Sequence, residues 1–296
     1  MIVRIHQRKK KKRNEWLVTW PSLFWLSLLF MIPTAIVFMV AFKPTDNYGG
    51  IGPGWTLETL RHMANPNYPA IIWRTVTQSF LTTLICILLA VPAGYFIARA
   101  NRPWRQILLL LVIVPFWTSF LIRIFAWKIL LHPEGMIKQG LVFLHVIRPE
   151  VSLLYNSGAV LLVMVYTFLP FAILPIYAAA EKFDFHLLEA ARDLGARQWQ
   201  AFLRIFIPGI RRGLLTAILV VFIPALGSYV IPDIVGGPNA EMIGNKIAQR
   251  VFVDRNLPQA SGLSAFLILG VLIPLLAVLA LQRSRDRAAP IIQEDA

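Results

Sequence analysis

Six long apolar segments divide this sequence, and they limit the kind of fold that it can adopt. They cover about residues 17–42, 75–98, 107–131, 158–180, 213–235 and 262–282. A helix needs about 20 predominantly apolar residues to cross the hydrocarbon core of a bilayer. Backbone N–H and C=O groups in lipid must be hydrogen-bonded within the segment, so we expect helices. The sequence therefore predicts an all-α integral membrane protein with six transmembrane helices, and its composition, 57% hydrophobic and 15% charged, agrees.

The Lys and Arg residues predict the direction in which these helices cross the membrane, because cytoplasmic loops carry an excess of both. One side holds nineteen of them: Arg4, Arg8, Lys9, Lys10, Lys11, Lys12, Arg13, Arg99, Arg102, Arg105, Lys182, Arg192, Arg197, Arg204, Arg211, Arg212, Arg283, Arg285 and Arg287. The loops of the other side hold eight: Lys43, Arg61, Arg74, Lys138, Arg148, Lys246, Arg250 and Arg255. We therefore expect both termini to be cytoplasmic.

The chain has a net charge of +14, and its basic residues lie mainly at the ends of the apolar segments. This distribution favours anionic lipid over nucleic acid as the partner of the basic residues.

We expect three parts along the chain: a basic cytoplasmic tail over 1–16, a six-span domain over 17–282 and a cytoplasmic tail over 283–296. The first apolar segment is too long for a cleaved signal peptide, and no small-residue cleavage site follows it. Residues 56–63 follow a Gly-Pro-Gly turn with a helical pattern, which predicts a short helix on the outer surface. The polar end after Arg287 is expected to be unstructured.

The sequence contains no pattern that predicts an enzyme or a metal site. Its one cysteine, Cys86, lies inside an apolar run, and its five histidines lack the spacing of metal ligands. Neither the G-x-x-x-x-G-K-[ST] nor the G-x-G-x-x-G nucleotide-binding motif occurs. We expect no catalytic residue, metal or cofactor in this chain. An ion-coupled secondary transporter is disfavoured too, because no apolar segment has Asp or Glu near its centre.

A polar stretch between the fourth and fifth apolar segments has a helix–turn–helix pattern. Asp184 is suited to cap a helix N-terminus, and Gly195 is suited to end that helix. One face of the first helix would hold Leu187, Ala190, Ala191 and Leu194, opposite Glu189, Arg192 and Asp193. A second amphipathic helix would begin near Arg197, with Trp199, Phe202, Leu203 and Phe206 on one face, and stop at Pro208. An ordinary amphipathic linker on the membrane surface would show the same periodicity.

The spacing within this stretch resembles the cytoplasmic EAA loop of ABC-importer permeases. Glu189-Ala190-Ala191 is followed after three residues by Gly195 and, after nine more, by Ile205-Phe206-Ile207-Pro208, where Ile207 replaces the usual Leu. The resemblance implies a loop that couples the permease to a separate ATPase, which binds ATP and Mg. It implies these coupling residues: Glu189, Ala190, Ala191, Asp193, Leu194, Gly195, Ile205 and Pro208.

Prolines predict interruptions in two of the apolar segments. The fourth contains Pro170 and Pro175, and the fifth contains Pro224, Gly227 and Pro232. A broken helix at membrane depth exposes backbone groups that can line a passage, although a packing kink is the alternative. The candidate residues for such a path are Trp117, Tyr166, Tyr229 and Asp233.

Two basic side chains lie within the third apolar segment. Arg123 and Lys128 fall toward its outer end, where we expect them to extend to the membrane interface. If either of them faced the pore, it would repel a cationic substrate.

Three further stretches, 115–123, 166–177 and 224–238, are similar to the spermidine/putrescine importer permeases, in particular the putrescine type. This resemblance implies a type I ABC importer in the bacterial cytoplasmic membrane, with a second permease, two ATPase copies and an extracytoplasmic binding protein. It implies polyamine transport, and permeases for thiamine, iron, thiosulfate or phosphonate-like solutes share much of the pattern. Ser228 stands where the putrescine type usually carries Glu. A site in this segment that binds a cation directly would therefore lack that carboxylate.

Overall fold

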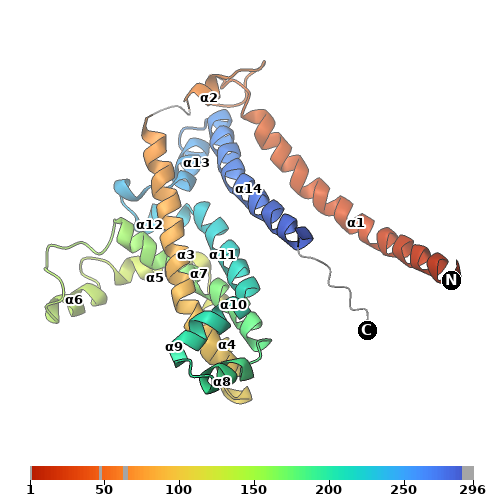
Figure 1. Cartoon of the computed structure of the whole chain (residues 1–296). Helices are drawn as coiled ribbons and strands as arrows, with labels where there is room; N and C mark the ends of the chain where they lie inside the picture. Colours follow the sequence, from red (N-terminus) through yellow and green to blue (C-terminus); the bar gives the residue numbers. More distant parts are fainter. Residues whose placement is uncertain (1, 47–48, 63–65, 289–296) are drawn as a thin grey trace. The chain divides into compact units, whose positions relative to one another are not determined.

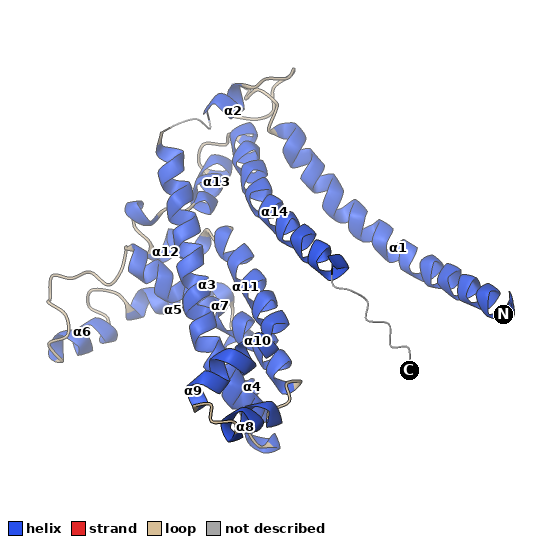
Figure 2. Cartoon of the chain, in the orientation of Figure 1, coloured by secondary structure: helices blue, strands red, loops and turns tan. Residues whose placement is uncertain are grey.

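The computed structural model describes residues 2–46, 49–62 and 66–288. Helices and loops make up these residues, and the one extended pairing within them is an isolated antiparallel bridge between Thr45 and Ile51 (Figure 2). The predicted all-α class is thus confirmed for the described part of the chain. Contacts divide the chain into two compact units, one of Met1–Asn65 with Ile247–Ala296 and one of Pro66–Lys246.

The first unit combines the two ends of the chain. α1 (Ile2–Val40) packs against α14 (Leu257–Ala288), which also contacts α2 (Glu58–His62) (Figure 1). The stretch Thr19–Val40 of α1 has a mean hydropathy of 2.4, yet its apolar side chains face outward, as Phe30 does with 70% of its surface exposed. Such a surface is typical of a helix that contacts lipid or other membrane helices.

The short surface helix predicted over 56–63 is present as α2, although Met63 lies outside the described residues. Nearby, Asn256 caps α14, because its side-chain oxygen accepts hydrogen bonds from the Gln259 N–H (3.0 Å) and from the Thr45 hydroxyl (3.1 Å). Residues 289–296, the end of the predicted C-terminal tail, also lie outside the described residues.

The second unit is built around three helices, α3 (Asn67–Arg99), α7 (Ser157–Glu181) and α11 (Arg211–Leu226), each packed against the other two. Their buried surfaces are rich in small side chains and largely apolar, apart from Thr167 on α7 and a run of polar residues on α3, which are Thr75, Gln78, Ser79, Thr82 and Thr83. Among the core residues are Cys86, Ala90, Val163, Ala172, Ile176, Ala217, Val221 and Ala225. Small residues let helix backbones approach closely, which is how membrane helices associate without a hydrophobic driving force.

Two glycines mark the closest contacts in this bundle. A Cβ added to Gly94 would lie 2.8 Å from the side chain of Ile176, and one added to Gly213 would lie 2.4 Å from the Cβ of Ala179. Larger residues at either glycine would therefore push α7 away from its neighbour.

The third apolar segment is bent. α4 (Arg102–Ile113) continues into a 3-10 turn, η1 (Val114–Trp117), and α5 (Phe120–Leu130) then leaves at 91°. The continuous helix predicted over 107–131 is therefore wrong. Pro115 has no N–H to donate, which weakens a helix at this point. The Thr118 hydroxyl donates a hydrogen bond of 2.7 Å to the Pro115 carbonyl and so satisfies an acceptor at the turn.

The two predicted interruptions have different outcomes. α7 runs without a break through Pro170 and Pro175, so the interruption predicted in the fourth segment is wrong. A membrane helix can hold a proline, because neighbouring helices and side chains can satisfy the backbone groups that the proline leaves unpaired. The fifth segment does break: α11 ends at Leu226, and three residues separate it from α12 (Val230–Val235).

Three helices in the described part of the chain are long and apolar enough to cross a membrane, or up to five if each of two bent pairs counts as one span. α14 adds a shorter apolar stretch, Leu257–Ile273. The count of six spans therefore stays a prediction. The remaining short elements are α6 (Met136–Phe143), α8 (His186–Asp193), α9 (Gln198–Ala201), the π-helical turn η2 (Phe202–Phe206), α10 (Ile207–Gly209), η3 (Pro238–Ala240) and α13 (Ile243–Phe252).

Candidate coupling loop and transport path

The polar stretch between α7 and α11 folds into two short helices around a glycine corner, as predicted. The Asp184 carboxylate accepts the His186 N–H at 3.0 Å and so supports the start of α8. At the other end, Gly195 has a φ of +87°, the left-handed region that glycine adopts without strain. The Ala196 N–H bonds to the Ala191 carbonyl (3.0 Å) and the Gly195 N–H to the Arg192 carbonyl (2.9 Å), the pairing of a Schellman motif.

The predicted apolar face of α8 packs inside the chain only in part. Of its four residues Ala191 is buried, whereas Ala190 is exposed, Leu187 is 50% exposed and Leu194 is 90% exposed. The helix also buries Leu188, which the prediction left off this face. The helix is thus rotated relative to the expectation. Its apolar edge is open to solvent or to a partner.

The second helix differs from its prediction in two ways. Of the four residues expected on one face, Phe206 is fully buried and Phe202 is half-buried, whereas Trp199 is 68% and Leu203 is 43% exposed. The π-helical turn η2 brings Phe202 and Phe206 onto the same side, with ring centroids 5.2 Å apart. Pro208 does not stop this helix, which ends only after Gly209 because the proline takes a first-turn position in α10.

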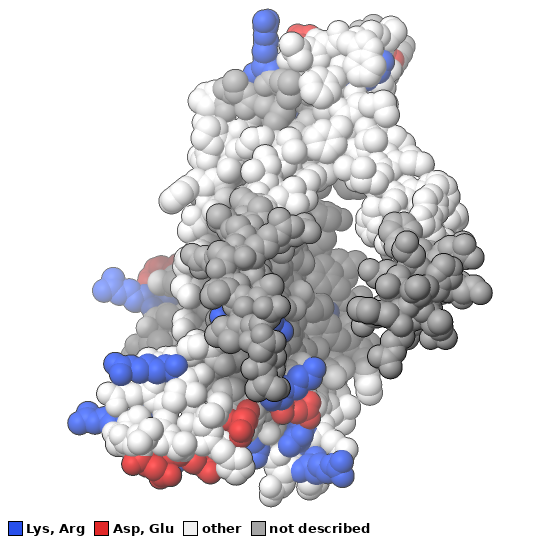
Figure 3. Space-filling view, turned by 45° about the vertical axis from the view of Figure 1, so that its right-hand side comes forward, with Lys and Arg blue, Asp and Glu red and all other residues white. Residues whose placement is uncertain are grey.

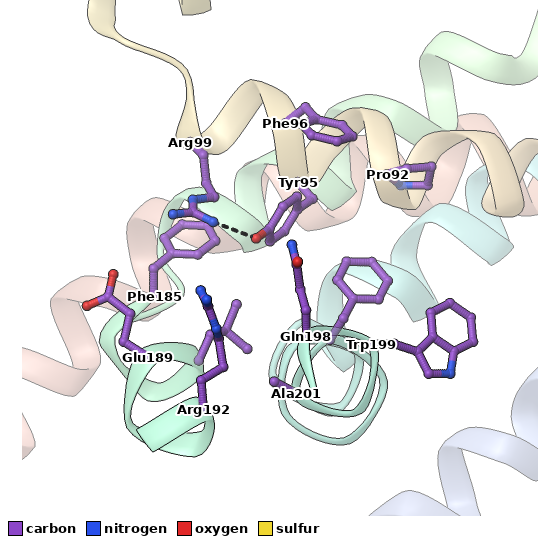
Figure 4. A pocket seen from close by; sticks show the side chains of 12 residues that line it. Pro92, Tyr95, Phe96, Arg99, Phe185, Glu189, Arg192, Gln198, Trp199 and Ala201 are labelled. Carbon is purple, nitrogen blue, oxygen red and sulfur yellow. Dashed lines mark hydrogen bonds between the residues drawn. The ribbon is translucent and has the colours of Figure 1, made fainter. Parts of the chain in front are cut away.

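An aromatic cluster joins this loop to the C-terminal end of α3. The Lys and Arg pattern predicts that this end of α3 lies on the cytoplasmic side. The ring of Tyr95 makes edge contacts with Phe185 (5.8 Å), Phe202 (5.4 Å) and Phe206 (5.0 Å), measured between ring centroids. The hydroxyl of Tyr95 accepts a hydrogen bond of 2.7 Å from Arg99 (Figure 4). Edge-to-face packing of this kind adds about 0.5–1.5 kcal/mol per pair beyond burial. The loop is therefore held firmly against α3.

Beside this cluster, a cavity of about 430 Å³ separates α3 from α8 and α9. Figure 4 shows Arg192 and Gln198 pointing from the two short helices toward the side chains of α3. Arg99, Glu189 and Arg192 supply its charges, and aromatic rings form much of the remaining wall.

The eight predicted coupling residues fall into two groups. Ala191 is buried and Ile205 is half-buried, so both help to anchor the loop. The exposed group consists of Glu189, Ala190, Asp193, Leu194, Gly195 and Pro208. The Glu189 carboxylate lies 3.2 Å from the His186 Nδ1, and charged side chains gather at this end of the unit, the lower end of the view in Figure 3.

The predicted transport-path residues do not come together. Tyr229 lines a cavity of about 420 Å³ at the break between α11 and α12. Tyr166 instead makes an edge contact with Trp127 at 5.3 Å, Trp117 is 75% exposed, and Asp233 lies exposed on α12. None of these last three is among the residues that line that cavity.

The cavity at the helix break is formed by residues of η1, α5, α7, α11 and α12 and of the break between the last two. Its walls hold Phe116, Phe120, Arg123, Thr167, Phe168, Phe171, Pro224, Gly227, Ser228, Tyr229 and Val230. Asn245 fixes the break by donating from Nδ2 to the Tyr229 carbonyl at 3.1 Å. The break thus creates a defined hollow, as the proline and glycine pattern of the fifth segment predicts.

Arg123 is the charged residue that lines this cavity, and it was not among the predicted path residues. Its guanidinium lies over the ring of Phe116, 4.9 Å from the centroid. The extension of Arg123 to the membrane interface stays a prediction. Lys128 lies near a second ring, 5.9 Å from the centroid of Tyr155.

Known proteins that resemble this chain are membrane transport subunits. The family described as "Binding-protein-dependent transport system inner membrane component" matches residues 90–289. The spermidine/putrescine transport system permease protein PotB of Haemophilus influenzae is 35% identical over 240 residues, 81% of this chain and 84% of the relative. PotB of Escherichia coli is 34% identical over 251 residues, 84% of this chain and 91% of the relative.

The fold matches a solved transporter. A subunit of a bacterial ABC transporter that imports the acidic polysaccharide alginate superposes with a TM-score of 0.69 at 18% identity, over 97% of this chain and 100% of that one. At this identity the match supports the fold alone. The sequence matches go further: this chain belongs to the family of binding-protein-dependent transport system inner membrane components.

Proposed function

We propose that this chain is the permease subunit of an ATP-driven importer and that the α8–α10 loop couples it to a separate ATPase. The observation that carries the proposal is the exposed apolar edge of this loop, where Leu194 is 90% and Trp199 is 68% exposed. Apolar side chains exposed on a well-anchored loop are typical of a protein interface. The spacing of the EAA pattern supports the same role for the same residues.

The packing of the loop offers a route by which movement of an ATPase could reach the membrane helices. The Tyr95 cluster holds the loop to α3, and α10 leads through a 71° bend into α11. α11 ends at the break that lines the cavity. A push on the loop would therefore move both α3 and α11, and it would act on the cavity at the far end of α11.

For the substrate, we propose a polyamine such as spermidine or putrescine. The support comes from the names of the two PotB relatives and from the aromatic walls of the cavity, where Tyr229 and Phe171 offer ring faces. A ring attracts an ammonium group by about 0.5–2 kcal/mol, so the cavity would hold a polyamine only weakly. Tight binding would then belong to the separate binding protein.

A second candidate is a permease of the same family for another small solute, such as thiamine, an iron complex, thiosulfate or a phosphonate. Arg123 favours the anionic solutes among these, thiosulfate and a phosphonate, because a guanidinium in the cavity attracts an anion and repels a cation such as thiamine. An ion-coupled secondary transporter is the least supported class, since no acidic residue lines this cavity within the described part of the chain.

The proposed assembly contains a second, homologous permease, an ATPase dimer that binds ATP and Mg, and an extracytoplasmic binding protein. This chain would contribute no cofactor site and no catalytic residue. It would cross the bacterial cytoplasmic membrane six times with both termini in the cytoplasm, as its Lys and Arg distribution predicts.

Uptake by proteoliposomes that contain the complete complex tests this function. Radiolabelled putrescine and spermidine should accumulate when ATP is present on the ATPase side, and omission of the binding protein should abolish uptake. Parallel assays use labelled thiosulfate, thiamine and an iron chelate. If one of these solutes is carried and neither polyamine is, the polyamine assignment fails and the importer class survives.

A further inference from the structure

The cavity at the helix break has an unusual charge for a polyamine passage. Of the eleven residues that line it, Arg123 is the one charged residue, and none carries a carboxylate. Five of the others are aromatic, and the remaining polar groups are hydroxyls, which include those of Thr167 and Ser228. The walls therefore attract an ammonium group through ring faces and repel it through a fixed cation.

The position of Arg123 makes this repulsion effective. Its guanidinium covers the ring of Phe116 at 4.9 Å, so it already occupies a face that a substrate ammonium group would use. Its Nε atom is buried and has no hydrogen-bond partner in the described part of the chain, and Arg123 forms no ion pair there. A cation that no anion neutralises repels an ammonium group that enters the same apolar-walled hollow.

We propose that Arg123 prevents the cavity from retaining a polycation. This inference rests on the proposed polyamine import and concerns its affinity at one site. Arg123 occupies the face of Phe116 and repels the substrate, so a polyamine passes the other rings without being trapped. A neutral side chain at position 123 would remove the repulsion and free a ring face, and the cavity would become a binding site that slows release.

Equilibrium binding tests this inference directly. Radiolabelled spermidine is added to the detergent-purified complex without its binding protein, for the wild type, Arg123→Gln and Arg123→Lys. We expect Arg123→Gln to bind spermidine at least about tenfold more tightly than the wild type, while Arg123→Lys, which keeps the charge, stays close to the wild type. Equal affinity in all three proteins, or equally tight binding by both variants, would overturn the inference.

A second variant controls for a local structural effect of the Arg123 substitution. Ser228 lines the same cavity, so Ser228→Glu adds a carboxylate without removing Arg123. This change should also increase retention of spermidine, and Ser228→Gln should not. If Ser228→Glu and Arg123→Gln both leave binding unchanged, the cavity does not control retention.

Wild-type uptake separates this inference from the proposed function. If the wild-type complex imports no polyamine, the substrate assignment fails and the inference fails with it. If the wild type imports polyamine but Arg123→Gln binds spermidine no more tightly than the wild type, only the inference about Arg123 is wrong.

Discussion

The Arg99 guanidinium donates a hydrogen bond of 2.7 Å to the Tyr95 hydroxyl, one turn earlier on α3, and also lies 5.6 Å from the centroid of the Tyr95 ring. This pair orients the tyrosine so that its ring edges and faces meet the phenylalanines of the α8–α10 loop. Arg99 also lies 5.7 Å from the centroid of the Phe185 ring, so Tyr95 and Arg99 together join α3 to the loop, and Tyr95 makes most of the aromatic contacts.

Replacing Tyr95 by Ala should therefore detach the loop from α3. We expect a loss of about 2–4 kcal/mol in stability, near the range for a core aromatic residue, and a strong loss of uptake. Thermal unfolding in detergent and proteoliposome uptake measure the two effects. Phe96→Ala is the matched control, because the neighbouring ring is 68% exposed. Equal losses in both variants would contradict the central position of Tyr95.

Gly213 should tolerate no side chain. A Cβ there would lie 2.4 Å from the Ala179 Cβ and 2.7 Å from the Pro175 carbonyl oxygen, and a backbone oxygen cannot move aside easily. Gly213→Ala should lower stability by about 1–3 kcal/mol through overpacking. Gly270→Ala, at a helical glycine whose added Cβ would meet no atom within 4 Å outside its own helix backbone in the described part of the chain, should leave stability nearly unchanged. Comparison of the two melting temperatures checks the prediction.

Gly195→Asp should abolish uptake while the subunit still inserts into the membrane. The left-handed conformation at φ +87° costs an ordinary residue about 1–2 kcal/mol, which would distort the corner between α8 and α9. Within the described residues nothing lies within 4 Å of the added Cβ, so the core stays intact. Gly195→Asn is the control, since Asn adopts this conformation more readily. Normal uptake by Gly195→Asp would show that transport does not depend on the conformation of the turn at Gly195.

The orientation prediction can be checked in intact cells. In a Cys86→Ser background, single cysteines replace Asn14 and Asn239, which the Lys and Arg pattern places on opposite sides of the membrane. A membrane-impermeant maleimide added from outside should label position 239 and leave position 14 unlabelled. The reverse labelling would contradict cytoplasmic termini.

The sequence predicted the helical class, the glycine corner and the broken fifth segment, because each depends on local chemistry. Apolar length, the conformational freedom of Gly195 and the prolines near Gly227 act within a few residues. The bend before α5 was missed because a single proline, as at Pro115, also fits a continuous membrane helix, as Pro170 and Pro175 do in α7.

The site residues that were missed depend on contacts between distant parts of the chain. Tyr95 meets Phe206 across more than a hundred residues, and no periodicity predicts that pairing. The rotation of α8, which buries Leu188 and exposes Leu194, follows from that packing. Arg123 enters the cavity because of the bend, so a straight-helix prediction could not place it there.

The central claim is tested most directly by the Leu194→Asp variant, in which the amount of co-purified ATPase and the rate of ATP-driven uptake are measured. Leu144→Asp is the matched control, because Leu144 is 67% exposed and lies outside the loop. In proteoliposomes that contain the complete complex, Leu194→Asp should lose most of the co-purified ATPase together with ATP-driven uptake of the substrate, and Leu144→Asp should retain both. If Leu194→Asp retains the ATPase and transports at the wild-type rate, the exposed edge of the α8–α10 loop is not where an ATPase drives this permease.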